Sequence, residues 1–566
     1  NIVSRVSEII NLDIKKENIK AICRGSFLVG ETYEHPFIKQ TSKIVPADYV
    51  TMLEGTGLVH TAPGHGIDDY QTGLKENLDL YCPVQADGTY DDTVPSWIQG
   101  KLIWDANPII IDKLKETQSL LYHYSFRHSY PHDWRSKTPV IFRSTEQWFV
   151  GVDTPTESNK KTLRNMALAA ISDQIKFTPE WGKKRLKGMM ESRPDWCISR
   201  QRSWGLPIPA FMLNGTPFLT AGSVTAISKV FSEKGSDAWF KESPQDLLCH
   251  YHPEKDPDCP PEFDSSKLEK LYDIFDVWFE SGSSWKAVME PNGHTIPVDL
   301  YLEGSDQHRG WFHLSLLLGL GATQQPPYKR LLTHGFIVDK DGKKMSKSTG
   351  NTLNVNDILK QYGAEVLRWW VSSLPYENDI KVDPSFFDQA SDSYRKIRNT
   401  IRFLLSNLHD YSGPKTHAKL NLLLTEENLP STSINAWILD ELEDLIEHNK
   451  RRYEKFEFQL VHKLIYLFCN DSLSAIYCAT VKDRLYCDPP QSERRVRTQQ
   501  TMAKILLTLC ELLSPILPHT SEEAVSSFTE TNDSAEFHSS EVDLFNSPGC
   551  HPNWELVIKQ RESVLK

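Results

Sequence analysis

Apolar stretches of two kinds alternate in the middle of the chain, between about residues 125 and 384. Short runs typical of strands, Val298–Glu303 and Leu331–Val338, are followed by longer stretches with helical spacing, Gly310–Leu320 and Val355–Ser372. Strands that alternate with amphipathic helices predict βαβ units and a mostly parallel sheet. We therefore expect an α/β domain in this part of the chain.

The two ends of the chain follow different patterns. Residues 1–120 combine short β-type runs such as Ala21–Gly30 with turns rich in Gly, Pro and Asp, which indicates a mixed α/β domain. In the last third, long amphipathic stretches cover Ile434–Phe456, Phe458–Arg484 and Arg494–Leu513. The predicted fold class is thus α/β, followed by an all-α bundle.

Composition narrows the class of protein. A length of 566 residues predicts roughly three to five domains, and 39% hydrophobic with 24% charged residues is ordinary for a globular protein. The longest apolar stretches, Leu314–Gly321 and Ile505–Leu517, are shorter than the ~20 residues that cross a bilayer. The ten cysteines form no Cys-x-x-Cys pair, and Cys249, His252 and Cys259 lack a fourth ligand, so we predict no zinc site. A net charge of −12 means that any contact with nucleic acid must be local.

The stretch Lys344-Met345-Ser346-Lys347-Ser348 carries the clearest chemistry. Activation of a carboxylic acid by ATP expels pyrophosphate, so ammonium groups must stabilise negative charge on the β and γ phosphates in the transition state. Two lysines in a loop of small residues suit that task. An isolated five-residue match would be better explained as a surface loop, but a second segment favours catalysis. We therefore predict that Lys344 and Lys347 are catalytic.

The second segment, Tyr301–Phe312, runs from a strand end through a glycine-containing turn into a helix. Ligand crevices of parallel sheets form at such strand ends. The carboxylate of Glu303 suits an ammonium group, and Asp306 and Gln307 can bind ribose hydroxyls. Trp311 offers an apolar wall for an aliphatic side chain, with a core tryptophan as the alternative.

Together with the segments Asp276–Trp285 and Asp195–Gly205, these motifs closely resemble the isoleucyl-tRNA synthetases of class I, over essentially the whole chain. The string Glu-Gly-Ser-Asp-Gln-His-Arg-Gly-Trp is the isoleucyl form, whereas valyl and leucyl relatives carry other sequences. The resemblance implies an isoleucine–tRNA ligase that uses ATP and Mg²⁺ to form isoleucyl-AMP and transfers the acyl group to tRNA(Ile). It further implies a monomer in the bacterial cytoplasm, with an organelle matrix as the alternative.

The resemblance also assigns roles to residues. Trp311 and, with it, Trp278 are implied to line the isoleucine pocket. The positions implied to bind ATP or the adenylate are Glu303, Gly304, Asp306, Gln307, His334, Gly335 and Lys347.

The segment Gly55–Tyr70 holds two His and two Asp within ten residues, but without the compact spacing of a metal site, so no metal is predicted. It resembles the editing domain of the same family, where the residue matching Asp69 holds the α-ammonium of a misacylated residue and the one matching His60 helps to seat it. One missing methylene is worth only ~1–3 kcal/mol, a limit for which isoleucyl enzymes are themselves the standard example. Hydrolysis of valyl-tRNA(Ile) is therefore implied. Family editing sites also use a Thr-rich segment that would precede residue 1.

Three arginines in the last third share one face of a predicted helix. A solvated face is the usual explanation, but further basic clusters occur at Lys450–Arg452 and Arg494–Arg497, and Ser514–Glu523 resembles the anticodon-binding domain of these synthetases. Unstacked bases are read by stacking and edge hydrogen bonds, for which arginine is apt. The predicted tRNA-binding residues are Arg395, Arg398 and Arg402.

The second signature of class I, His-Ile-Gly-His, does not occur in these 566 residues, and the chain begins without Met. We expect a fragment that lacks the first half of the nucleotide-binding fold and the C-terminal end, and that does not activate isoleucine alone. The expected domains are a partial editing domain (1–125), the second half of a Rossmann-type catalytic domain (126–385) and a truncated anticodon-binding domain (386–566). The alternatives are a valyl or leucyl enzyme, and a non-catalytic tRNA-binding or deacylase protein.

Overall fold

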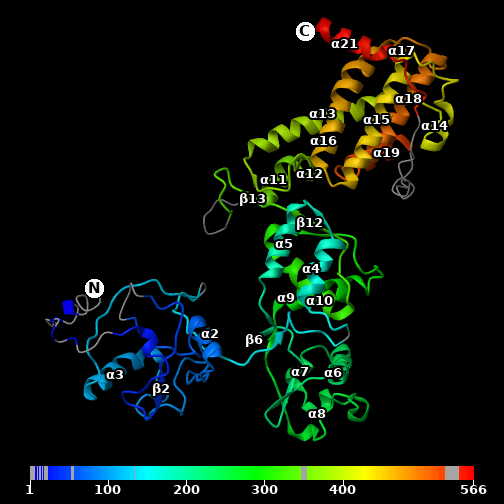
Figure 1. The fold of residues 1–566 in the computed structure, drawn as a ribbon. Helices are drawn as coiled ribbons and strands as arrows, with labels where there is room; N and C mark the ends of the chain where they lie inside the picture. The colour runs from blue at the N-terminus through cyan, green and yellow to red at the C-terminus, as the bar shows by residue number, and fades with distance from the viewer. Residues whose placement is uncertain are drawn as a thin grey trace. The chain divides into compact units, whose positions relative to one another are not determined.

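The computed structural model describes residues 7–8, 11, 15, 17, 19, 23–51, 57–133, 136–157, 159–345, 353–529 and 547–565. Its internal contacts divide the chain into two compact units, Asn1–Trp148 and Phe149–Lys566 (Figure 1). This division falls later than the expected boundary between residues 125 and 126. Because compactness does not assign function, the functional domains 1–125, 126–385 and 386–566 stay a prediction.

The first unit has few regular elements, which are η2 (Gly25–Phe27), β1 (Thr32–Glu34), β2 (Thr41–Lys43), α2 (Ile67–Glu76) and α3 (Ile103–Glu116). β1 and β2 pair antiparallel. In the described part, a small cluster of buried apolar residues forms around Val94, Ile98 and Ala106. The strand expected over Ala21–Gly30 is wrong for its described part, where small residues form a 3-10 turn and Gly30 has a φ of +92°.

The first part of the second unit, before the helical bundle, contains a three-stranded parallel sheet. Its strands are β4 (Lys176–Thr178), β11 (Tyr301–Gly304) and β12 (Arg330–His334), in the order β11-β12-β4 with parallel pairing throughout. The helices α4 (Leu163–Asp173), α5 (Trp181–Glu191) and α10 (Trp311–Thr323) accompany this sheet, with α4 packed against α5 and α10 (Figure 1). α10 connects β11 to β12 and is buried on almost every side. The predicted βαβ unit is confirmed.

Short antiparallel strand pairs join the motif-bearing segments. The strands are β3 (Phe149–Val150), β5 (Trp196–Cys197), β6 (Ser199–Arg200) and β10 (Ile274–Phe275). The helical elements of these segments are α9 (Val277–Gly282), the π-helix η5 (Trp285–Met289) and η6 (Ser305–His308). β3 pairs with β5, and β6 pairs with β10 with Ile274 opposite Arg200. The segments 195–205 and 276–285 are therefore neighbours in space.

A small module with its own core is inserted between these two segments. It consists of β7 (Phe211–Leu213), β8 (Thr216–Phe218), α6 (Ala221–Lys234), α7 (Ala238–Lys241), α8 (Pro244–Leu247), η3 (Pro253–Lys255), η4 (Ser265–Lys267) and β9 (Leu268–Lys270). Phe211 and Trp239 lie in its buried cluster. In the loop that contains Cys249 and Cys259, the Asp256 carboxylate accepts hydrogen bonds from Thr220 Oγ1 (2.5 Å) and from the Tyr251 hydroxyl (2.8 Å). The loop is thus fastened by a carboxylate. Sequence patterning had not separated this module.

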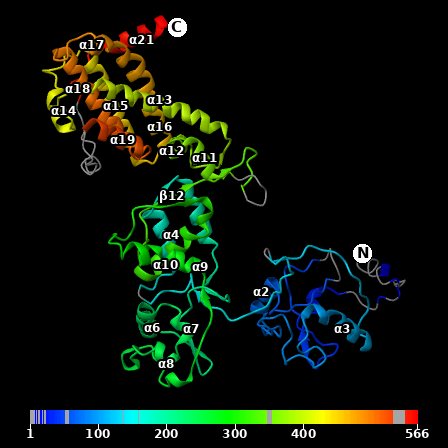
Figure 2. The ribbon, with the colours of Figure 1, turned by 180° about the vertical axis from the view of Figure 1, so that it is seen from behind.

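The last third of the chain forms the expected helical bundle. Its elements are α13 (Ser385–Asn407), α14 (His417–Leu423), α15 (Ile434–Glu454), α16 (Phe458–Leu467), the π-helix η8 (Phe468–Cys478), α17 (Lys482–Tyr486), α18 (Glu493–Leu513), α19 (Pro518–Thr529) and α21 (Asn553–Leu565) (Figure 2). α18 is central, since all ten residues from Thr501 to Cys510 are buried. The single helix predicted over Phe458–Arg484 is interrupted by η8. None of the described helices combines the length and apolarity that a bilayer crossing requires.

Two helices link the sheet to the bundle. α11 (Val355–Tyr362) and α12 (Ala364–Ser372) are separated by Gly363, and β13 (Ile337–Val338) pairs in parallel with β14 (Ile380–Lys381). The buried carboxylate of Glu365 accepts hydrogen bonds from the backbone N–H groups of His519 (2.8 Å) and Thr520 (3.1 Å) at the start of α19. Arg368 donates to the carbonyl oxygens of Pro515 (2.7 Å) and Ile516 (2.8 Å). A negative side chain, Glu365, and a positive one, Arg368, thus both attach α12 to the bundle.

Candidate active site

The carboxyl ends of β11 and β12 lie side by side and bring four predicted residues together. Glu303 is opposite Thr333 and Gly304 is opposite His334 in the parallel register. The Glu303 Oε1 atom lies 3.8 Å from His334 Nε2 and accepts a hydrogen bond from the Gly304 N–H at 2.9 Å. Its side chain is half exposed. A carboxylate in this position can bind an ammonium group that arrives from solvent.

The two glycines at this edge allow close approach of the backbone. A Cβ atom on Gly335 would lie 2.2 Å from the carbonyl carbon of Asn378, and one on Gly304 would lie 3.0 Å from Asp306 Oδ1. The loop is fastened further because the Phe336 N–H donates to Asp379 Oδ1 at 2.8 Å. Any larger residue at position 335 would displace the neighbouring strand end.

Asp306 and Gln307 lie in the turn η6, and the structure distinguishes them. Gln307 Oε1 accepts a hydrogen bond from the Trp311 N–H (3.0 Å) at the start of α10, and Gln307 Nε2 donates to Asp306 Oδ2 (3.2 Å). Asp306 is exposed. Asp306 is thus available to accept hydrogen bonds from ribose hydroxyls, whereas the carbonyl side of the Gln307 amide caps a helix.

Trp278 and Trp311 meet at Gly310. A Cβ atom on Gly310 would lie 2.7 Å from Trp278 Cη2, so the ring of Trp278 crosses the start of α10. The Trp311 ring stacks on Tyr301 at 4.0 Å between centroids, and its Nε1 donates to the Ser281 carbonyl at 2.9 Å. Trp311 is therefore a fixed, partly buried side chain, as the core alternative expects, and its role as a pocket wall stays a prediction.

Asp276 orients Trp278 and had not been predicted. Its buried carboxylate accepts hydrogen bonds from Trp196 Nε1 (3.0 Å) and the Trp278 N–H (3.3 Å), and it pairs with Arg200 (3.0 Å). The sequence did hold a signal, because an Asp directly before an apolar helix is a typical N-cap. Asp276 therefore joins the two motif-bearing segments.

Two buried histidines behind the site were also missed. His308 Nδ1 lies 2.9 Å from the Ser305 carbonyl oxygen, and burial is the main cause that lowers the pKa of His308. Burial, followed by the charge of Arg193, lowers the pKa of His313 to about 3. Both imidazoles are therefore neutral near pH 7 and add no positive charge to the interior around α10.

The lysine loop begins in a tight turn. The Asp339 carboxylate accepts hydrogen bonds from the N–H groups of Asp341 (3.1 Å) and Lys343 (2.7 Å). Lys344 is exposed and bridges back to Val338, while Met345 packs against the apolar cluster of α12 and α13. Lys347 lies outside the described residues.

The residues of the predicted editing site lie in the first unit. Asp69, in the first turn of α2, accepts hydrogen bonds from the Ala62 N–H (3.0 Å) and the Tyr49 hydroxyl (3.2 Å). His60 is exposed and lines a cavity of about 2220 Å³, whose lining does not include Asp69. The structure therefore gives Asp69 a fixed orientation without bringing it into the wall that His60 lines.

The three predicted RNA-binding arginines differ in their surroundings. Arg395 pairs with Asp392 at 3.0 Å, and Arg398 pairs with Glu523 at 2.8 Å, a contact that raises the pKa of Arg398. Arg402 is exposed. Two of the three guanidinium groups are thus already neutralised within the bundle.

A family model now accounts for most of this chain. The model described as tRNA synthetases class I (I, L, M and V) matches residues 4–383, which include the sheet edge and the lysine loop. The chain belongs to the class I tRNA synthetase family. A second model, the anticodon-binding domain of tRNA ligase, matches residues 435–555. Arg395, Arg398 and Arg402 of this synthetase chain lie between the two matched ranges.

Curated relatives of this class I chain carry the name isoleucine–tRNA ligase. That of Petrotoga mobilis is 40% identical over 551 residues, which cover 96% of this chain and 58% of the relative. That of Carboxydothermus hydrogenoformans is 42% identical over 566 residues, which cover 97% and 58%. The chain thus spans a little over half the length of these relatives.

Solved structures of class I synthetases also align with part of the chain. Methionyl-tRNA synthetase of Mycobacterium tuberculosis in complex with methionyl-adenylate aligns with 74% of this chain and 70% of its own, at 15% identity and a TM-score of 0.46. A leucyl enzyme from Agrobacterium radiobacter in a ternary complex aligns with 64% and 43%, at 18% identity and a TM-score of 0.41.

Proposed function

We propose that the whole protein is an isoleucine–tRNA ligase. In the proposed reaction the isoleucine carboxylate attacks the α-phosphorus of ATP, pyrophosphate leaves, and a hydroxyl of the terminal ribose of tRNA(Ile) then displaces AMP from the isoleucyl carbonyl. The observation that carries the proposal is the position of Glu303 beside His334 at the carboxyl edge of the sheet, followed along the chain by the start of α10, which the Trp278 ring crosses. The names of the relatives support isoleucine as the amino acid.

The residues divide the proposed work by chemistry. Glu303 binds the α-ammonium, and the wall of Trp278 and Trp311 contacts the aliphatic side chain. Asp306 accepts hydrogen bonds from the ribose, while Lys344 and Lys347 stabilise charge on the leaving pyrophosphate. Among the described residues, no three His, Cys, Asp or Glu side chains lie close enough to hold a metal ion. We therefore propose that Mg²⁺ enters with the phosphates of ATP, as it does in many nucleotide sites.

Exchange of labelled pyrophosphate into ATP by the whole protein tests this proposal. Exchange should depend on isoleucine, and Glu303→Gln should raise KM for isoleucine more than KM for ATP, because it removes the partner of the ammonium group. Asp299→Asn, in an exposed pair with Lys329, removes the same negative charge away from the sheet edge and should leave both constants unchanged. Stronger exchange with valine or leucine would overturn the assignment of isoleucine.

The 566 residues alone are expected to show no exchange, since they contain no His-Ile-Gly-His word. The same assay on this chain checks that expectation. Exchange at the rate of the whole protein would contradict it.

We further propose that the whole protein hydrolyses valyl-tRNA(Ile), with the oriented carboxylate of Asp69 binding the α-ammonium of the misacylated residue and His60 helping to seat it. The hydrogen bonds from Tyr49 and Ala62 support this role, because they hold the carboxylate in one direction. Asp69→Asn should reduce deacylation of valyl-tRNA(Ile) at least tenfold and leave pyrophosphate exchange unchanged. Equal loss of both activities would contradict a separate editing site. We propose that the whole protein binds tRNA(Ile) as its partner. We also propose that it acts as a monomer in the bacterial cytoplasm.

A further inference from the structure

A pocket of about 330 Å³ lies in the bundle between α13 and the segment formed by η8 and α17. Its wall includes Lys396, Asn399 and Phe403 of α13, together with Asn470 of η8 and Lys482 of α17. The π-helix η8 forms one side of the pocket, and π-helical insertions in helices are frequent at functional sites. The volume is at the lower end of the ~300–1,000 Å³ typical of small-ligand sites.

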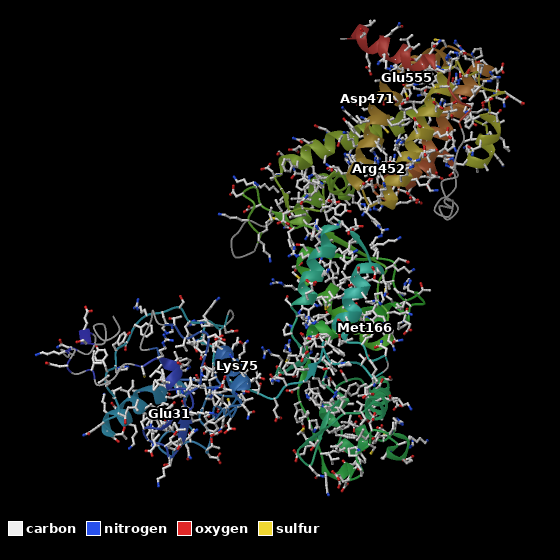
Figure 3. All side chains as sticks on the ribbon, in the orientation of Figure 1. Glu31, Lys75, Met166, Arg452, Asp471 and Glu555 are labelled. Atoms are coloured by element: carbon white, nitrogen blue, oxygen red, sulfur yellow. The ribbon has the colours of Figure 1, made fainter. Side chains whose placement is uncertain are left out.

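The ammonium group of Lys396 is held in place on the pocket wall. Its Nζ lies 3.0 Å from the Tyr466 hydroxyl and 3.4 Å from Asn470 Oδ1, and it also lies over the Tyr466 ring at 5.6 Å. The hydrogen bond to Tyr466 is the main cause that raises the pKa of Lys396, followed by the charges of Asp471 (labelled in Figure 3) and Asp392. Lys396 is therefore a fixed cation near pH 7.

The pocket carries positive charge that the bundle does not neutralise by direct pairing. Among the described residues, no carboxylate comes within 4.0 Å of the ammonium nitrogen of Lys396 or Lys482. Neighbouring Arg395 and Arg398 on the same helix are both paired with carboxylates, Asp392 and Glu523. The adjacent residues Arg395 and Lys396 therefore carry the same positive charge, but only Arg395 forms an ion pair with a carboxylate.

The donors of this pocket suit an anion attached to an apolar group. The two ammonium groups and the Asn399 amide can donate to phosphate oxygens, while Phe403 offers an apolar contact for a ribose or base. Asn470 and Lys482 lie inside the range matched by the anticodon-binding model, whereas Lys396 and the three arginines of α13 lie before it. An RNA backbone fits these features, since phosphodiester contacts position RNA on a protein.

We propose that this pocket binds a backbone phosphodiester of tRNA, with Lys396 and Lys482 as the phosphate ligands. The proposal rests on the proposed function in one respect, namely that the protein binds tRNA. It replaces the arginine face of α13 with the lysine pocket as the main contact of that helix.

Binding of fluorescently labelled tRNA(Ile) to this chain, measured over a range of salt concentrations, tests the pocket. Lys396→Gln and Lys482→Gln should each weaken binding about three- to tenfold and lower the salt slope by about 1, as expected for one lost phosphate contact. Arg395→Gln removes the same charge one residue away and should change affinity less than twofold. Tyr466→Phe leaves the charge and removes the hydroxyl that holds Lys396, so it should weaken binding about twofold with an unchanged slope.

The outcomes separate this proposal from the proposed function. If the unmodified chain binds tRNA(Ile) and the lysine variants behave like Arg395→Gln, the pocket is refuted while tRNA binding stands. If the unmodified chain does not bind tRNA(Ile), the pocket is refuted, and the ligase activity proposed for the whole protein is judged separately by pyrophosphate exchange. If inorganic phosphate competes at millimolar concentration and an acidic peptide of the same charge competes equally well, the pocket is a general anion site and the proposal is overturned. Unchanged thermal unfolding of each variant confirms that the fold is intact.

Discussion

The first unit and the helical bundle bury their apolar residues very differently. In the bundle, one connected cluster contains nearly all the apolar residues of α18, and Leu509 and Leu513 are fully buried. In the described part of the first unit, the buried cluster is small and adjoins a cavity of about 2220 Å³, while Phe27 and Leu121 are 75% and 72% exposed. Because buried apolar area is the main stabilising contribution, the bundle has more to lose by a core substitution.

The largest effect should come from the bundle core. Leu509→Ala is expected to lower the free energy of unfolding of the second unit by ~2–5 kcal/mol, since it leaves a cavity in a closely packed helix. Ile98→Ala, in the first unit, should cost less than half as much, because Ile98 already lines a hollow and loses fewer contacts. Urea unfolding that follows each unit separately measures both. Equal losses would show that the two cores are equally packed.

A smaller effect is expected where α12 meets the bundle. Glu365→Ala leaves the N–H groups at the start of α19 without their acceptor, which should cost ~1–3 kcal/mol in the unfolding of the second unit. Glu523→Ala, on the exposed side of α19, is the matched control and should cost less than ~1 kcal/mol. If Glu523→Ala lowers the free energy of unfolding as much as Glu365→Ala does, burial of the Glu365 carboxylate does not explain the loss.

Acid should weaken the second unit in a defined window. Burial lowers the pKa of His313 to about 3 and that of His462 to about 4, from an unfolded value of 6.5. The unfolded chain therefore binds more protons between those values, so the stabilisation is complete above pH 6.5 and is lost as the pH falls from there towards 4. The expected slope is at most ~1.4 kcal/mol per pH unit for each group. Urea midpoints at pH 7.5 and 5.5 measure it, and His462→Gln should reduce the slope; an unchanged slope would exclude His462 as a source.

The smallest effect is expected in the first unit. Asp69→Asn removes a negative charge from the first turn of α2 and weakens the bond to the Ala62 N–H, which should cost ~1 kcal/mol in the unfolding of that unit alone. Asp68→Asn, in the same turn and exposed, controls for the charge. A comparable loss in both variants would assign the effect to the helix dipole and not to the hydrogen bonds.

The periodicity of apolar residues predicted those elements that are regular along their whole length. The run Arg494–Leu513 became α18 almost residue for residue, and the strand–helix–strand order of β11, α10 and β12 was correct. The break at η8 could not be predicted, since a π-helix keeps an apolar pattern that resembles an α-helix. The run Ala21–Gly30 misled for a different reason, because it contains Gly25 and Gly30, and glycine adopts backbone conformations outside the strand region.

The predicted site residues depended on motifs, and their partners depended on tertiary structure. The strand-end rule predicted that Glu303 lies at the end of a parallel strand, and the structure brings His334, which the resemblance had implied, to the same edge. The ion pairs that neutralise Arg395 and Arg398 join residues on one helix or on α13 and α19, and no spacing along the chain shows that Glu523 comes close to Arg398. For the same reason the contacts of Lys396 could not be predicted, since they come from α16 and η8.

The shared acceptor Asp276 ties together two stretches of sequence that lie eighty residues apart. Trp196, Arg200 and the Trp278 backbone all use the same carboxylate, so a change in one alters what the others gain from their contact. Energies of single substitutions at Trp196 and Arg200 should therefore fail to add. Exchanging either of these stretches alone between relatives should therefore damage a protein in which both are otherwise functional.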